Sequence, residues 1–224
     1  AKPKLSPSTL AIKDLPQEKI IEQCIMAIRA GADMLHFDVV GGQGKKTAVI
    51  EEGSDDVSSL FTPAVLKEIK ERGREEGLVI PIDVHVMDVE PTESMLEALI
   101  TAGGDYIVVH WEAFRNKNNL LKRLRFIQSK GAKPGIAIRP DVDINVVIKF
   151  LIKYPGLVKL VSQLGVYPCL GGQTMVYDIL NNVKRLDVVR REHKLDYQIM
   201  VDGGIEAEVS GRKAFWAGAD ILVA

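Results

Sequence analysis

The sequence predicts an α/β fold, namely a (β/α)8 TIM barrel of eight parallel strands. Short apolar segments alternate with segments of helical periodicity along the 224 residues. The apolar segments are continuous runs, as in parallel strands that are buried on both faces. Polar side chains end several of them, and a barrel gathers such strand ends on one face. An open doubly wound sheet is the alternative, but eight units in this length favour the closed barrel.

The first half of the chain supplies four expected strands. Residues 4–10 form a short strand that stops in polar residues, and a helix over 17–30 has apolar residues at helical spacing before Gly31. A strand over 35–40 is followed by an irregular stretch, 41–62, and then by a helix over 63–76 that Pro63 opens. The strand at 82–87, the helix at 93–102 and the apolar strand at 106–110 follow.

The second half repeats the alternation. A charged helix over 118–130 precedes a strand at 135–140, and a helix over 144–154 precedes a strand at 157–164. A glycine-bearing loop, 167–173, leads into a helix over 174–192 and a strand at 197–202. A helix over 206–217, in which Trp216 is expected to pack, precedes the last strand at 221–223. We expect residues 1–224 to form a single domain that lacks the helix expected after the eighth strand.

Composition narrows the class of protein. A hydrophobic fraction of 46% is ample for a core, and a net charge of −1 gives no reason to expect nucleic acid or a membrane as partner. The two cysteines, Cys24 and Cys169, form no disulfide or zinc motif, and Cys24 lies in a helical pattern as a small core residue. No signal peptide or membrane span is recognisable, so we expect a soluble cytoplasmic protein.

Histidine and aspartate end three of the apolar strands. His36 and Asp38 are two residues apart and therefore project from the same face of a strand. His85 lies in the run 82–87, and Asp202 ends another run directly before Gly203 and Gly204. A single such residue is usually structural, but groups of this kind from three strands predict a shared metal site. His110 also ends a strand, and we expect it to be packed or behind the site.

Several stretches, in order along nearly the whole chain, resemble the D-ribulose-5-phosphate 3-epimerase family. They are Leu5-Ser6-Pro7-Ser8, Leu35-His36-Phe37-Asp38-Val39, Asp83-Val84-His85-Val86-Met87 with Glu90-Pro91, Val109-His110-Trp111-Glu112, Pro168 with Gly171-Gly172-Gln173, Val201-Asp202-Gly203-Gly204-Ile205 and 217–224. Each is weak alone, but the ordered set is specific. The stretch 41–62 and the segment Tyr167-Pro168-Cys169-Leu170 depart from the family pattern.

The resemblance implies a metal-dependent epimerase that interconverts D-ribulose 5-phosphate and D-xylulose 5-phosphate. It implies one divalent ion, zinc, iron or manganese, held by His36, Asp38, His85 and Asp202, with Asp38 and Asp202 as the proton-transfer groups. The substrate would contact Ser8, His85, Met87, Gly171, Gly172, Gly203 and Gly204, the glycines lying beside its phosphate. The resemblance further implies a homo-oligomer, a dimer or larger.

Three alternatives stay open at this point. A hexulose-phosphate 3-epimerase, such as one acting on allulose 6-phosphate, would share the chemistry on a longer sugar. A phosphosugar decarboxylase or aldolase-type lyase would need a lysine in a DxKxxD strand end, and no lysine follows Asp38 before Lys45. A barrel that only binds phosphosugars would have no use for two histidines and two aspartates at strand ends.

Overall fold

The computed structural model describes residues 2–41, 61–168 and 173–224, in which eight parallel strands form one sheet. The strands are β1 (Lys4–Ser6), β2 (Leu35–Val40), β3 (Ile82–Met87), β4 (Tyr106–His110), β5 (Lys133–Ile138), β6 (Leu160–Leu164), β7 (Gln198–Asp202) and β8 (Ile221–Val223). They are ordered β1-β8-β7-β6-β5-β4-β3-β2. This is the topology of the predicted (β/α)8 barrel, and the fold prediction is confirmed.

The sheet comes close to full closure between β1 and β2. The amides of Asp33 and Met34 donate to the carbonyl of Leu5 at 3.0 and 3.2 Å, and the amide of His36 donates to the carbonyl of Pro7 at 3.0 Å. An isolated parallel bridge joins Ser8 to His36. These bonds hold the residues that follow β1 beside β2, next to His36, the first polar residue of the site.

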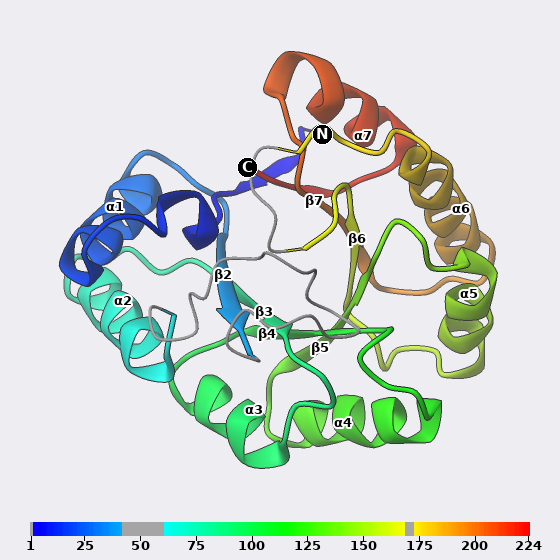
Figure 1. The fold of residues 1–224 in the computed structure, drawn as a ribbon, viewed down its shortest axis with the longest axis horizontal. Coiled ribbons are helices and arrows are strands. Elements are labelled where there is room, and N and C mark those ends of the chain that lie inside the picture. Colours follow the sequence, from blue (N-terminus) through cyan, green and yellow to red (C-terminus); the bar gives the residue numbers. More distant parts are fainter. Residues whose placement is uncertain (1, 42–60, 169–172) are drawn as a thin grey trace.

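Seven α-helices in the described residues surround the strands (Figure 1). They are α1 (Gln17–Arg29), α2 (Pro63–Glu75), α3 (Glu93–Thr101), α4 (Lys117–Ser129), α5 (Ile144–Lys153), α6 (Ile179–Glu192) and α7 (Arg212–Ala217). A 3₁₀ turn, η1 (Thr9–Ile12), precedes α1, and a π-helical turn, η3 (Ala207–Gly211), precedes α7. No helix in the ranges given above is both long and apolar enough to cross a membrane.

Two apolar clusters lie on opposite sides of the sheet. The larger cluster fills the space between strands and helices, and includes Cys24 of α1 as predicted. The smaller one fills the inside of the barrel with Met34, Tyr106, Val108, Ala137, Leu160, Met200, Ile221 and Val223. Because this inner cluster occupies the axis, the barrel is a packed core, and polar chemistry is confined to the carboxyl ends of the strands.

Several element bounds differ from the predictions by a few residues, and three differences have a clear physical reason. The first strand ends at Ser6, because the Ser8 hydroxyl accepts a hydrogen bond from the Leu10 amide at 3.1 Å and caps η1. The sixth helix begins at Ile179, because the amide of Val176 bonds to the carbonyl of Gly165 (2.8 Å) and holds the preceding segment against β6. Trp216 is 71% exposed, so the expectation that it packs was wrong.

The exposure of Trp216 follows from the face that α7 buries. Ala214 and Ala217 are 0% and 4% exposed and turn toward the barrel. One helical position is a rotation of about 100°, so the residue just before Ala217 points away from that face. The guanidinium of Arg212 lies 5.3 Å from the Trp216 ring centre and partly covers it.

Candidate active site and metal centre

Four polar side chains from three strands meet inside one end of the barrel. His36 and Asp38 come from β2, His85 from β3 and Asp202 from the last residue of β7. The parallel register places Asp38 beside His85, so the two strands present these side chains at one level. His36, Asp38 and His85 are 1%, 3% and 2% exposed, and the Asp202 side chain is 15% exposed.

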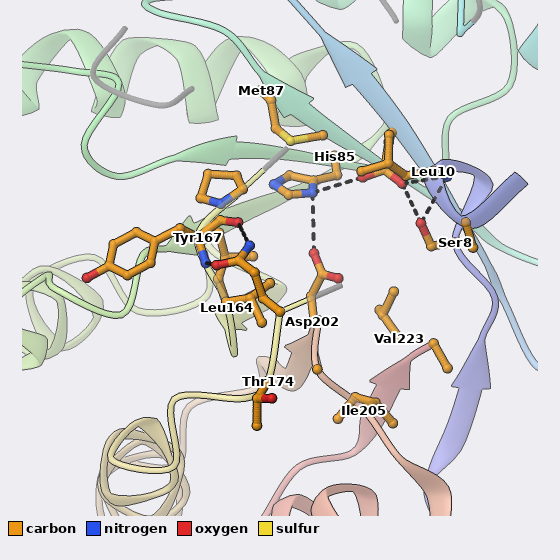
Figure 2. A pocket seen from close by; sticks show the side chains of 18 of the residues that line it. Ser8, Leu10, His85, Met87, Leu164, Tyr167, Thr174, Asp202, Ile205 and Val223 are labelled. Carbon is orange, nitrogen blue, oxygen red and sulfur yellow. Dashed lines mark hydrogen bonds and ion pairs between the residues drawn. The ribbon is translucent and has the colours of Figure 1, made fainter. Parts of the chain in front are cut away.

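The donor atoms of these residues alternate between nitrogen and oxygen at nearly equal spacing. The Nε2 of His36 lies 3.2 Å from the Oδ1 of Asp38 and 3.3 Å from the Oδ2 of Asp202. The Nδ1 of His85 lies 3.3 Å from the same Asp38 oxygen and 3.4 Å from the same Asp202 oxygen. The contact between His85 and Asp202 is visible in Figure 2.

This set fits a divalent transition metal. Although fully buried, the Nε2 of His36 and the Nδ1 of His85 have no hydrogen-bond partner among the described residues. Buried polar atoms in native proteins are normally paired, so two nitrogens that lack a hydrogen-bond partner and point toward two carboxylates call for a reason. Bonds of about 2.0–2.2 Å to one ion would hold neighbouring ligand atoms at about this spacing, and mixed imidazole and carboxylate donors suit zinc, iron or manganese. Three of the residues, His36, Asp38 and His85, place ligand atoms within 4.8 Å of one another, whereas Asp202 falls outside this group and, of these three, approaches only the two imidazoles.

The far nitrogen of His36 is held by a buried carboxylate. The Oδ1 of Asp83 lies 2.5 Å from the Nδ1 of His36, and the Ser6 hydroxyl donates to the other Asp83 oxygen at 3.3 Å. Asp83 is 0% exposed and pairs in register with His36 across β2 and β3. A carboxylate that accepts from one ring nitrogen leaves the other nitrogen free as a ligand.

The far nitrogen of His85 is held by another histidine. The Nε2 of His85 and the Nε2 of His110 are 2.7 Å apart, and the Nδ1 of His110 lies 2.6 Å from the Oε1 of Glu112. His110 is 0% exposed and lies behind His85, away from the cavity, as the sequence predicted. It therefore supports a candidate ligand and does not line the substrate cavity.

Charges around the site shift three pKa values. Burial alone would lower the pKa of His36, but Asp83, Asp38 and Asp202 outweigh it and raise that pKa well above its ordinary value. Burial works in the opposite sense on Asp38, yet the neighbouring His36 and His85 hold the pKa of its carboxyl well below the usual range. The pKa of His110 is lowered by burial, against the opposing pull of Glu112. Asp38 is therefore an ionised carboxylate.

A cavity of about 470 Å³ opens directly above these residues. Asp38, His85 and Asp202 line it together with the apolar residues Leu10, Met87, Leu164, Val166 and Val223. Figure 2 shows His85 and Asp202 facing each other in this cavity. Lys13 and Glu206 also line it. The volume suits a small ligand, because pockets for such ligands range over about 300–1,000 Å³.

Ser8 holds Asp38 from the other side. Its hydroxyl donates to the Oδ2 of Asp38 at 2.7 Å, and the amide of Leu10 donates to the same oxygen at 3.3 Å. The Oδ1 of Asp38 is left facing the two imidazoles. Both oxygens of this carboxylate therefore have fixed surroundings, with Ser8 lining the cavity beside it.

Gly203 and Gly204 line the cavity where β7 ends. Both adopt left-handed backbone conformations, with φ of 92° and 66°. A Cβ on Gly204 would lie 2.7 Å from the amide nitrogen of Met175, so only glycine allows the two backbone segments to approach here. The other predicted glycines, Gly171 and Gly172, lie outside the described residues, as do Cys169 and most of the stretch 41–62.

Sequence reasoning missed Asp83, Glu112 and Lys13 as members of the site. Two of them carried a signal, because Asp83 is two residues before His85 and Glu112 is two residues after His110. Only the register between β2 and β3, however, shows that Asp83 reaches His36. Lys13 gave no such signal, since it reaches the cavity by following directly on η1, a segment that was expected to be strand and loop.

Comparison with known proteins shows the family of the chain. A sequence model described as the ribulose-phosphate 3 epimerase family matches residues 4–224. The chain belongs to the ribulose-phosphate 3 epimerase family. The predicted resemblance is thereby confirmed.

Curated relatives of the family cover most of the chain. Ribulose-phosphate 3-epimerase from Chlamydia trachomatis is 32% identical over 199 residues, which are 87% of this chain and 74% of the relative. The enzyme of the same name from Eremothecium gossypii is 31% identical over 223 residues, 100% of this chain and 84% of the relative. Among solved structures, 3-hexulose-6-phosphate synthase from Salmonella typhimurium matches with a TM-score of 0.65 at 15% identity, covering 99% of this chain and 88% of that one. At this identity the match shows only a shared fold.

Proposed function

We propose that this chain is a metal-dependent 3-epimerase that interconverts D-ribulose 5-phosphate and D-xylulose 5-phosphate. The observation that carries the proposal is the pair of carboxylates, Asp38 and Asp202, which face one cavity. They lie beside two imidazoles, each with a buried ring nitrogen that has no hydrogen-bond partner among the described residues. Membership of the ribulose-phosphate 3 epimerase family supports the same substrate class.

Epimerisation next to a ketone needs a base on one face of the carbon and an acid on the other. Asp38 and Asp202 project from β2 and β7, which β1 and β8 separate in the barrel, and so reach the substrate from different sides. Asp38 is ionised and can accept the C3 proton, while Asp202 returns a proton to the opposite face; in the reverse direction the roles exchange. A positioned general acid or base typically contributes about 10²–10⁴-fold.

Removal of the C3 proton leaves an enediolate with negative charge on oxygen. A divalent ion held by His36, Asp38, His85 and Asp202 supplies Lewis-acid stabilisation of that charge when bound. Met87, Leu164 and Val223 exclude water from the cavity wall beside these groups. We assign the phosphate to the glycine pair Gly203–Gly204, because the backbone of a glycine turn can approach an anion closely. We keep the prediction that Gly171 and Gly172, which lie outside the described residues, contact the phosphate as well.

The direct test combines elemental analysis of the purified protein with an epimerisation assay in deuterated water. We expect about one metal ion per chain, interconversion of the two pentulose phosphates, and solvent deuterium at C3 of both. Metal-loaded protein that binds ketose phosphates without C3 exchange would be a binding protein only. Faster turnover of allulose 6-phosphate than of ribulose 5-phosphate would reassign the substrate to the hexulose series.

A lyase activity on the same barrel is disfavoured by the site itself. No lysine comes from the β2 end that carries Asp38, whereas the DxKxxD pattern would place one there. We also propose, as predicted, that residues 1–224 form one domain and that the protein is a homo-oligomer. Light scattering on the purified protein measures the oligomeric state.

A further inference from the structure

We infer that Glu112, acting through His110, is a positioning residue that fixes the proton on the far side of His85 and keeps the metal-facing nitrogen of His85 bare. The inference rests on the metal site of the proposed function. It concerns the relay formed by His85, His110 and Glu112, in which neither His110 nor Glu112 lines the substrate cavity.

The geometry of the two rings defines a directed hydrogen bond. The planes of His85 and His110 differ by 16° and their centres are 4.8 Å apart, while the two Nε2 atoms are only 2.7 Å apart. The nitrogens therefore lie between the ring centres, and the rings meet edge to edge nearly in one plane. Each neutral imidazole has one N–H and one bare nitrogen, so this contact holds one proton, donated by one ring and accepted by the other.

Only two proton arrangements satisfy the contact. In the first, His85 donates through Nε2 to His110, and His110 donates through Nδ1 to Glu112, which leaves the Nδ1 of His85 bare toward Asp38 and Asp202. In the second, His110 donates to His85, which then carries its proton on Nδ1. The second arrangement places a bare His110 nitrogen 2.6 Å from a carboxylate oxygen, two acceptors without a proton between them. In the metal-free protein the first arrangement also leaves the Nδ1 of His85 facing acceptors, the Oδ1 of Asp38 and the Oδ2 of Asp202, but at 3.3 and 3.4 Å. The contact between His110 and Glu112 is much shorter, so Glu112 favours the first arrangement, the one able to bind a metal through Nδ1.

The surroundings of Glu112 favour this role over a packing role. Its Oε1 meets His110, while its buried Oε2 has no hydrogen-bond partner among the described residues. A carboxylate oxygen that is buried without a hydrogen-bond partner costs stability, so a gain elsewhere must retain it. The turn that carries it is pinned by Lys117, whose Nζ donates to the carbonyls of Trp111 and Phe114 at 2.6 Å each. A rigid turn holds the carboxylate where the relay needs it.

Together with Asp83, this gives the two candidate histidine ligands equivalent support by different routes. Asp83 accepts directly from the Nδ1 of His36 and leaves Nε2 for the metal. Glu112 acts on His85 through His110 and leaves the Nδ1 of His85 for the metal. Opposite ring nitrogens of the two histidines thus face the same centre, one set by the buried Asp83 and the other by Glu112, whose side chain is 15% exposed.

Two substitutions separate proton placement from packing. Glu112→Gln preserves size but presents both a donor and an acceptor to His110, so both proton arrangements become available. Glu112→Asp shortens the side chain but keeps a group that only accepts. We expect metal affinity, measured by competition with a chelator, to fall about 10–100-fold in Glu112→Gln, and to lie nearer wild type in Glu112→Asp. Glu97→Gln, which alters an exposed ion pair with Lys130, is the matched control and should bind metal like wild type.

A second readout follows the protons directly. In nitrogen-15 correlation spectra of the metal-free protein at alkaline pH, His85 should carry its proton on Nε2 in wild type and as a mixture in Glu112→Gln. Wild-type affinity in Glu112→Gln, or weaker binding in Glu112→Asp than in Glu112→Gln, would overturn the inference while leaving the metal site standing. Failure of the wild-type protein to bind metal would instead overturn the proposed function.

Discussion

Replacement of Asp202 by asparagine separates the two proton transfers that the site is proposed to perform. Asparagine preserves the shape of the side chain and one oxygen, so the spacings of 3.3 and 3.4 Å to His36 and His85 can be kept and metal can be retained. The variant loses the group that exchanges a proton on one face of C3. Asp38, fixed by Ser8 at 2.7 Å, still acts on the other face.

The expected size of the effect follows from the loss of one general catalyst. Epimerisation should fall about 10²–10⁴-fold, which raises the barrier by about 2.7–5.5 kcal/mol. One epimer should nevertheless continue to exchange its C3 hydrogen with deuterated solvent, because Asp38 can remove the proton and return a deuteron to the same face. The complementary Asp38→Asn variant should spare exchange in the opposite epimer.

The assay is proton NMR of each pentulose phosphate in deuterated water, with metal content measured on the same samples. Asp178→Asn, an exposed aspartate at the start of α6, is the matched control and should behave as wild type. If Asp202→Asn retains its metal and both epimers lose C3 exchange equally, then Asp38 and Asp202 do not each serve one face of C3. Undiminished epimerisation would refute a proton-transfer role for Asp202 altogether.

Three further predictions concern the surroundings of the site and the core. Lys13 lines the cavity, so we expect its charge to attract the phosphate of the substrate. Lys13→Met should therefore raise KM for a ketose phosphate about fivefold with little change in kcat, since one charge near a phosphate is worth about 1 kcal/mol in water, whereas Lys19→Met at an exposed position should not; equal KM values would show that Lys13 does not contribute to phosphate binding. Ser8→Ala should lower the free energy of unfolding by about 1 kcal/mol or more, because it removes both the η1 cap and the hydrogen bond to Asp38. Urea unfolding beside Ser94→Ala measures the loss, and an unchanged midpoint would contradict both contacts. Burial raises the pKa of the Cys24 thiol to about 12 from 9.0. The neutral thiol therefore contributes its full stability to the folded protein below pH about 9, and this contribution is lost as the pH rises toward the folded pKa. Near pH 10.5 the free energy of unfolding of wild type should have fallen by about 2 kcal/mol relative to Cys24→Ala, and a difference between the two proteins that does not change with pH would argue against the raised pKa.

The fold could be predicted because its signals are local. Continuous apolar strands, helical periodicity and glycine or proline at helix ends are properties of single segments. Eight alternating strand and helix segments in series are compatible with few topologies. The convergence of His36, Asp38, His85 and Asp202 could also be anticipated, because parallel strands in a barrel must end on the same face. Alternation along β2 already placed His36 and Asp38 on one side.

The supporting contacts could not be predicted, because they depend on register and turn geometry. His36 meets Asp83 only because β2 and β3 pair at that register, and a shift by one residue would point Asp83 to the other face. Lys13 reaches the cavity because Ser8 caps a 3₁₀ turn where a strand was expected. The burial of Trp216 was wrongly predicted because the short α7 buries only a narrow face formed by Ala214 and Ala217. The presence of apolar residues in the segment does not show which of them lie on that face.

The most direct test of the proposed site is an anomalous-scattering map from crystals of the metal-loaded protein. One peak is expected between the Nε2 of His36, the Oδ1 of Asp38, the Nδ1 of His85 and the Oδ2 of Asp202, within about 2.0–2.2 Å of each. A fully occupied metal elsewhere on the chain, with these four side chains hydrogen-bonded only to one another, would contradict it.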